Sequence, residues 1–408
     1  MREPETTGPD GKRLRARVEA EAYVASVCFK HGPPNLVGVE LEWTVHHRDD
    51  PRRRLDPADL AGALGPHTPR TLDPDSPQLP LPAGSPVTVE PGGQVEISSL
   101  PAPRFDHLLD AVIADHHHLA RLLDAAGLEL GARGTDPFRT PCRVLDTPRY
   151  AAMERAFEPI GPDGIAMMCA TAGLQVCVDV GEPEDVPARW NAITSMGPVL
   201  LALFANSPEL AGHPTGWASA RARAVFGCDP ARTTPLPLSD DPIETWTRHV
   251  LDTPLLCVRG PGDCWDAPPG VTFADWVAGA LPEAPTTADL DYHISTLFPA
   301  VRPQGYFEVR YLDAQPGSGW ITPAALITAL TADRATVDAV AGVCAPVADR
   351  WVEAAMHGLL DAPIAAAARA LLEVAGPAVD RMGLRPEYRH LITTDLHRLH
   401  DRATGRTS

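Results

Sequence analysis

One stretch of the sequence alternates strictly between apolar and polar side chains, and it carries two glutamates. In residues 37–45, valine, leucine and tryptophan occupy the odd positions, whereas Gly38, Glu40, Glu42 and Thr44 occupy the even positions. Successive side chains of a β-strand point to opposite faces, so the segment predicts a strand with one packing face. Two like charges on its other face repel each other, which predicts either a solvated outer face or a nearby cation.

Three further stretches follow the same alternation. Residues 87–98 contain a Pro-Gly-Gly turn and predict a hairpin, and residues 168–180 and 305–313 predict single strands. If one sheet packs its apolar face on helices, the polar faces of these strands converge on one surface. The side chains expected there are Glu40, Glu42, Glu90, Glu96, Gln175, Asp179, Glu308 and Arg310.

So many carboxylates on one surface require compensation, because buried charges must be paired or must coordinate a metal. Mg²⁺ suits such a surface, since it takes oxygen ligands, usually one or two carboxylates with waters and substrate phosphates. Two or more Mg²⁺ ions are therefore expected, and they would hold a triphosphate. The chain has neither a P-loop nor a Gly-x-Gly-x-x-Gly motif after a strand, so metals and arginines would hold the phosphates.

Two other groups of residues are candidates for binding, and each has a plain alternative. Arg221, Arg223 and Arg232 lie within a short span, which also fits an ordinary surface cluster. His293 lies on a helix predicted within residues 286–299, where a single histidine usually has a structural role. The run His116–His118 lies on the helix predicted over residues 102–126, and neighbouring helical positions diverge too far to chelate one metal.

The overall charge and the apolar runs exclude other classes of protein. The formal net charge of −18 argues against a nucleic-acid partner, because phosphate binding needs a basic surface. The charged residues 1–17 contain no apolar core typical of a secretory signal, and the apolar run 196–205 is too short to span a bilayer. The eight cysteines show no metal-binding spacing, which favours reduced thiols in a cytoplasmic protein without membrane contact.

The chain is expected to form one domain. Residues 1–12 predict a disordered tail, and residues 13–408 predict the domain itself. Within it, residues 36–320 carry the motifs, and the Ala/Leu-rich residues 321–402 predict a helical C-terminal part.

Taken together, the motifs resemble the glutamate–cysteine ligases, in particular the plant-type group and its actinobacterial members of the ergothioneine pathway. The similar segments are Gly38–Glu42, Glu90–Glu96, Ala172–Val176, Leu203–Pro208, Asp229–Arg232, Asp291–Pro299 and Tyr306–Arg310, in the order of the family. The resemblance implies an α+β fold with a glutamine-synthetase-like core, in which a curved, mainly antiparallel sheet has helices on its outer face.

The resemblance also implies roles for individual residues. It implies Mg²⁺ ligation by five glutamates, Glu40, Glu42, Glu90, Glu96 and Glu308. It implies phosphate and glutamate contacts from Arg221, Arg223, Arg232 and Arg310, with Arg310 and Arg221 offsetting the charge of the transferring phosphoryl group. Gln175 stands where some bacterial relatives have a metal-binding histidine. A water-mediated contact or a substrate contact is therefore expected as much as a direct bond from Gln175 to the metal. Asp179 and His293 complete the expected binding set.

The implied reaction joins L-glutamate and L-cysteine at the expense of ATP, through a γ-glutamyl phosphate, to give γ-glutamylcysteine, ADP and phosphate. The alternatives are a related carboxylate–amine ligase with another amine acceptor, a phosphagen-kinase-like enzyme on the same kind of core, and a non-catalytic protein that binds Mg-nucleotide. Omitting cysteine or glutamate from an assay separates them.

Overall fold

The computed structural model describes residues 11–405, and its centre is an antiparallel sheet. Within these residues six strands form this sheet in the order β3-β4-β1-β6-β10-β9. Two further pairs, β2 with β5 and β7 with β8, lie outside it. The strands are β1 Val37–Trp43, β2 Val45–His47, β3 Val87–Val89, β4 Val95–Ser98, β5 Leu128–Leu130, β6 Gly173–Asp179, β7 Glu209–Leu210, β8 His213–Pro214, β9 Val301–Pro303 and β10 Tyr306–Asp313.

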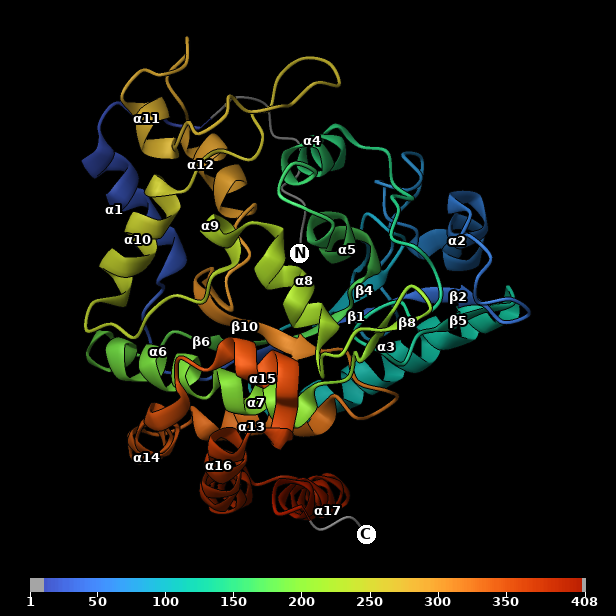
Figure 1. The fold of residues 1–408 in the computed structure, drawn as a ribbon, viewed down its shortest axis with the longest axis vertical. Coiled ribbons are helices and arrows are strands. Elements are labelled where there is room, and N and C mark those ends of the chain that lie inside the picture. Colours follow the sequence, from blue (N-terminus) through green and yellow to red (C-terminus); the bar gives the residue numbers. More distant parts are fainter. Residues whose placement is uncertain (1–10, 406–408) are drawn as a thin grey trace.

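Helices cover both faces of the sheet (Figure 1). They are α1 Arg17–Cys28, α2 Pro57–Leu64, α3 Phe105–Ala125, α4 Pro148–Phe157, α5 Asp163–Ala170, α6 Val186–Ser195, α7 Gly197–Phe204, α8 Ala220–Cys228, α9 Pro230–Thr233, α10 Pro242–Asp252, α11 Phe273–Val277, α12 Thr287–Ile294, α13 Ile321–Leu330, α14 Arg334–Cys344, α15 Trp351–His357, α16 Ala362–Arg381 and α17 Pro386–Ala403. The predicted α+β class with a mainly antiparallel sheet is confirmed.

The apolar face of the sheet forms the core, as the alternation predicts. Phe307 of β10 packs its ring against Trp190 of α6 and against Phe29, which follows α1, with centroid separations of 5.9 and 6.2 Å. α3, α7 and α13 also contact the strands. The opposite face carries the charged side chains and is covered by α4, α5 and α8, which appear on the other side of the sheet from α13 to α17 in Figure 1. Helices therefore cover the polar face of the sheet as well as its apolar face.

Two predicted boundaries are wrong. Met168 was expected to begin a strand, but it belongs to α5, and β6 begins only at Gly173. Residues 190–204 were expected to form one helix, kinked at Pro198, but Met196 separates α6 from α7. Pro198 lies in the first turn of α7, where a missing backbone N–H costs nothing, so it helps to begin a new helix.

Most of the predicted N-terminal tail, residues 1–10, lies outside the described residues, as do residues 406–408. The last position of that predicted tail is held in place, because the carbonyl of Lys12 accepts a 3.0 Å hydrogen bond from the backbone N–H of Thr287.

The C-terminal helices stack beneath the sheet. α16 is long and apolar enough to cross a membrane, and 50% of its apolar window is buried inside the protein. It packs against α7, α13, α14 and α17, which is typical of the central helix of a helical layer.

Candidate active site

The strand register places the predicted acidic side chains in rows across the polar face. Glu42 of β1 lies opposite Glu96 of β4, and Glu40 lies opposite Gln175 of β6. Glu308 of β10 lies opposite Cys177 on one side and Arg302 of β9 on the other. The register changes between Val309 and Leu312, and this irregularity accompanies the turn of Arg310 toward Gln175. Four stretches that are far apart in sequence thus form one polar surface.

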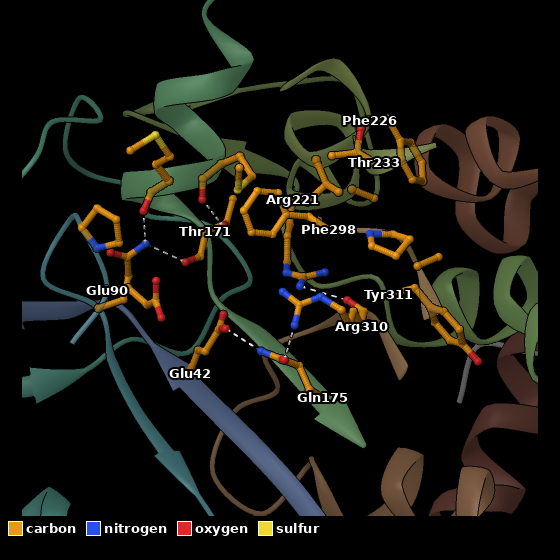
Figure 2. Close-up of a pocket in the computed structure, with 18 of the residues that line it drawn as sticks. Glu42, Glu90, Thr171, Gln175, Arg221, Phe226, Thr233, Phe298, Arg310 and Tyr311 are labelled. Carbon is orange, nitrogen blue, oxygen red and sulfur yellow. Dashed lines mark hydrogen bonds between the residues drawn. The ribbon is translucent and has the colours of Figure 1, made fainter. Parts of the chain in front are cut away.

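A cavity lies over this surface, and six of the predicted residues line it. They are Glu42, Glu90, Glu96, Gln175, Arg221 and Arg310. Figure 2 shows Glu42 and Glu90 at one end and Arg221 above Arg310 at the other. The remaining wall is mainly apolar and includes Met153, Met168, Phe226 and Phe298 from the helices and loops above the sheet. Acidic and basic groups therefore share one enclosed space, as a site for a charged substrate requires.

A chain of hydrogen bonds connects the two ends of this polar surface (Figure 2). The carboxylate of Glu42 accepts bonds from the backbone N–H of Gly173 at 2.6 Å and from the amide of Gln175 at 2.7 Å. The Gln175 carbonyl oxygen accepts from Arg310 at 2.6 Å, and Arg310 also donates to Glu308 at 2.5 Å. Gln175 therefore links an acidic group to a basic one, and its orientation is fixed by both.

Glu308 differs from the other glutamates because two arginines surround it. Arg302 donates to both of its carboxylate oxygens, at 2.7 and 3.0 Å, and both side chains are buried. Burial alone would raise the pKa of Glu308, but the charges of Arg302 and Arg310 hold it at about 2. Glu308 is thus ionised and anchored, and it fixes the position of Arg310.

The pKa values of three other glutamates move the opposite way. Burial, reinforced by the charge of Glu96, raises the pKa of Glu40, Glu42 and Glu90 to about 7 each. Between residues 11 and 405, Glu42 has no bidentate arginine partner of the kind that Glu308 has, and its carboxylate accepts from Gly173 and Gln175 instead. A carboxylate surface in this condition favours the binding of cations, because added positive charge stabilises the ionised forms.

Arg221 reaches the cavity from α8 and is held by a second buried carboxylate. Its guanidinium donates to the carbonyl of Arg310 at 3.0 Å, while its backbone N–H donates to the Ser207 hydroxyl at 3.1 Å. Ser207 and Ser219, the N-cap of α8, both donate to Asp313, at 2.7 and 2.8 Å. Within residues 11–405 the buried Nε of Arg221 has no hydrogen-bond partner, so it is available to an anionic ligand.

Six predicted residues do not line the cavity, namely Glu40, Glu308, Asp179, Arg223, Arg232 and His293. The Asp179 carboxylate accepts from the backbone N–H groups of Asn35 and Leu36, at 2.9 and 2.7 Å, and so fixes the entry to β1. Arg223 is 42% exposed and lies 3.8 Å from Asp163.

Arg232 and His293 are both buried away from the cavity. Arg232 pairs with Asp229 at 2.8 Å and donates to the carbonyl of Pro254. His293 lies 2.8 Å from the carbonyl of Val250 and stacks on Phe273. Burial lowers the pKa of His293 to about 3, so it is neutral.

The sequence patterns do not predict two arginines that lie in or beside the site. Arg302 lies in a strand of three residues, which is too short to show an alternation, although a hairpin through Gly305 would place it opposite Glu308. Arg149 lines the cavity from the first turn of α4 and donates to the hydroxyl and carbonyl of Ser295, at 3.1 and 3.0 Å. Nothing in the local sequence pattern distinguishes Arg149 from a surface arginine.

Comparison with known proteins gives the family. A model of glutamate–cysteine ligase family 2 matches residues 36–402, which is most of the chain. The chain belongs to glutamate–cysteine ligase family 2. Its relatives include a glutamate–cysteine ligase EgtA of Mycolicibacterium smegmatis, 37% identical over 88% of this chain and 83% of that protein. A chloroplastic glutamate–cysteine ligase of Medicago truncatula is 31% identical over 56% of this chain and 47% of its own length.

Among solved structures, the glutamate–cysteine ligase of Francisella tularensis in complex with AMP has a TM-score of 0.53. It is 12% identical, and the match covers 93% of this chain and 84% of that chain. At this identity the likeness concerns the fold alone. It agrees with the sheet and helix arrangement predicted for a glutamate–cysteine ligase.

The carboxylates of this family 2 ligase fit Mg²⁺ as separate oxygen donors and not as a prebuilt cage. Among residues 11–405, no three His, Cys, Asp or Glu side chains converge into a chelating group. Mg²⁺ usually takes one or two carboxylates and completes its shell with waters and substrate phosphates, so a prebuilt cage is unnecessary. Glu42, Glu90 and Glu96 line the cavity and Glu40 lies on the same strand face, so they are the hard oxygen donors that would hold such an ion.

Proposed function

We propose that this chain is an ATP-dependent glutamate–cysteine ligase that forms γ-glutamylcysteine for ergothioneine biosynthesis. The observation that carries the proposal is the bonded series Glu42–Gln175–Arg310–Glu308 on the floor of a cavity, in a chain of glutamate–cysteine ligase family 2. The relatives named glutamate–cysteine ligase EgtA support the choice of substrates, and the pathway follows from the resemblance to the ergothioneine-pathway members.

The chemistry needs an activated carboxylate, because a carboxylate does not condense with an amine in water. In the proposed reaction, an oxygen of the glutamate γ-carboxylate attacks the γ-phosphorus of ATP, and the bond from that phosphorus to ADP breaks. The cysteine amine then attacks the carbonyl carbon of the γ-glutamyl phosphate, the amide bond forms, and phosphate leaves with the bridging oxygen. Such phosphoryl transfers depend on positioning and on electrostatic stabilisation.

Two arginines supply the positive charge at the reacting groups. Arg310 is oriented by Gln175 and Glu308, and Arg221 lies over the Arg310 backbone with its Nε unpartnered within the described chain. Both are fixed before substrate binds, so little reorganisation is needed when charge develops on the transferring group. Mg²⁺, which would neutralise nucleotide phosphates when bound, is proposed to be held by Glu40, Glu42, Glu90 and Glu96, with Glu308 retained as a candidate ligand.

Arg149 adds a third arginine to the lining of the cavity, beside Arg221 and Arg310. Arg149 is buried between Ser295 and the ring of Tyr292, 5.0 Å from the ring centroid.

The proposed location is the cytoplasm, supported by eight cysteines that are all free thiols.

Isotope transfer tests the proposal directly. With glutamate labelled by ¹⁸O in its γ-carboxylate, each phosphate released in the presence of ATP and cysteine should carry one ¹⁸O atom, measured by mass spectrometry. The same experiment with Glu42→Gln should show little release, and with Arg223→Met it should match the parent chain. Phosphate that carries no label would exclude the γ-glutamyl phosphate route.

A further inference from the structure

A second cavity of about 400 Å³ lies outside the proposed active site. Its walls come from three places: Arg52 and Arg54 in the loop before α2, the segment 136–144, and Gly92 with Cys169. Cavities that hold small molecules typically measure about 300–1,000 Å³, so this space accommodates a ligand of metabolite size. None of the residues predicted from the sequence as site residues lines it.

The walls of this second cavity carry excess positive charge in a chain whose net charge is −18. Three arginines line it, and Arg139 is the one neutralised, by Asp136 at 2.7 Å. Arg54 donates to the sulfur of Cys142 at 3.3 Å. The side chain of Arg52 is exposed to solvent at the rim of the cavity and makes no hydrogen bond or ion pair with any residue between 11 and 405. Guanidinium groups match carboxylates and phosphates through paired N–H donors, so the cavity suits an anion.

The two cavities share a wall that is one layer of backbone thick. Pro91 and Met168 line the active-site cavity, whereas the next residues in the chain, Gly92 and Cys169, line the second one. The backbones touch, because a Cβ atom added at Gly92 would lie 2.1 Å from the Cys169 carbonyl oxygen. Glycine is therefore required at this position for the two segments to pack.

The shared wall also carries a proposed metal ligand. Glu90 begins the turn that contains Gly92, and its backbone pairs with that of Gln94 at 2.8 Å. The segment that lines the second cavity is bonded to the same turn, because the N–H groups of Val144 and Leu145 donate to the Pro91 carbonyl at 2.7 and 3.0 Å. The segment beside the second cavity is therefore hydrogen-bonded to the turn that supports Glu90.

We infer that the second cavity binds a small molecule with two or more carboxylate or phosphate groups, next to the turn that supports Glu90. The inference combines a space of metabolite size, a guanidinium without a partner, and a wall in common with the active site. It does not depend on ligase turnover, and its test measures binding alone.

The thiol of Cys142 provides a local reporter of occupancy. It is partly exposed inside the second cavity, whereas Cys264 is exposed elsewhere and serves as an internal reference. The full chain is alkylated with iodoacetamide, and peptide mass spectrometry gives the labelling rate of each cysteine. The probes are ADP for phosphates, γ-glutamylalanine for paired carboxylates without a thiol, and adenosine as the uncharged control.

We expect at least one of the two anions to slow the labelling of Cys142 without affecting Cys264, while adenosine protects neither. Arg52→Ala should raise the half-protecting concentration at least ~10-fold, because a charge-assisted hydrogen bond contributes about 1.5–3 kcal/mol. Arg53→Ala is the matched control, since Arg53 lies between the two lining arginines but pairs with Asp59 at 3.4 Å. It should leave the half-protecting concentration within about twofold of the parent chain.

The pattern of protection separates the two chemistries. Protection by ADP alone assigns the cavity to phosphates, and protection by the dipeptide alone assigns it to carboxylates. If neither anion protects Cys142, or if protection is the same in Arg52→Ala as in the parent chain, the inference is overturned.

Discussion

Replacing Arg302 by methionine should destabilise the protein more than removing any exposed arginine. The change deletes two of the three arginine hydrogen bonds to Glu308, those of 2.7 and 3.0 Å, and leaves the one from Arg310. Charge-assisted bonds contribute about 1.5–3 kcal/mol each, which gives ~3–6 kcal/mol for the pair. Losing one partner of a buried ion pair costs about 3–5 kcal/mol in other proteins, so we expect a loss of about 4 kcal/mol.

The assay is urea unfolding followed by circular dichroism, with a double-mutant cycle to isolate the pair. Glu308→Gln should also destabilise the protein, and the double variant Arg302→Met/Glu308→Gln should lose less than the sum of the two single losses, by at least ~2 kcal/mol. Arg223→Met is the control, because Arg223 is 42% exposed and should lose no more than about 0.5 kcal/mol. A loss below ~1 kcal/mol for Arg302→Met, or strict additivity, would refute the reasoning.

Three further predictions concern the site and its surroundings. Glu42→Gln should lower kcat at least ~100-fold at saturating Mg²⁺ with an unchanged circular dichroism spectrum, and near-normal turnover would remove Glu42 from the proposed metal set. Arg310→Lys should lower kcat/KM about 10- to 100-fold, because Gln175 and Glu308 both accept from Nη1 and lysine has no second terminal nitrogen to offer a phosphate; an unchanged value would exclude a role for the guanidinium. Burial lowers the pKa of His293 to about 3, below the ordinary 6.5, so its contribution to stability is complete above pH 6.5 and is lost as the pH falls toward 3. The limiting slope is about 1.4 kcal/mol per pH unit, and the difference in unfolding free energy between the parent chain and His293→Gln should change by about 1.2 kcal/mol between pH 6 and 5; a pH-independent difference would contradict the burial of a neutral histidine.

The strands and the acidic surface were predictable because period-two alternation reports the faces of a strand directly. The hairpin of β3 and β4 followed from the Pro-Gly-Gly turn, and Glu42, Glu96 and Gln175 lie together as expected. The alternation says nothing about register or about bulges. For that reason the pairing of Glu308 with Arg302 could be found only by building the hairpin explicitly.

The arginine cluster shows where reasoning from composition stops. Arg221 and Arg223 are two positions apart on α8, and successive helical residues are rotated by about 100°, so the two side chains point in nearly opposite directions. One enters the cavity, while the other faces Asp163 near the surface. Proximity in sequence suggested three phosphate contacts, whereas the helix geometry allows one of this neighbouring pair at the cavity.

Asp179 shows a limit of a different kind. It lies at the end of β6, and by alternation it follows Gln175 and Cys177. At a strand end, however, the backbone N–H groups of a neighbouring loop can donate hydrogen bonds to the carboxylate. Here the N–H groups of Asn35 and Leu36 donate to Asp179. Such capping contacts depend on the path of a loop that no periodic pattern records.

The measurement that tests the central claim most directly is phosphate release from ATP-Mg²⁺ with glutamate and cysteine left out in turn. If the cavity activates the γ-carboxylate of glutamate, release should be fast with both amino acids, slow without cysteine, and absent without glutamate. Release that does not depend on glutamate, or no release when both amino acids are present, would contradict the assignment of this cavity to glutamate–cysteine ligation.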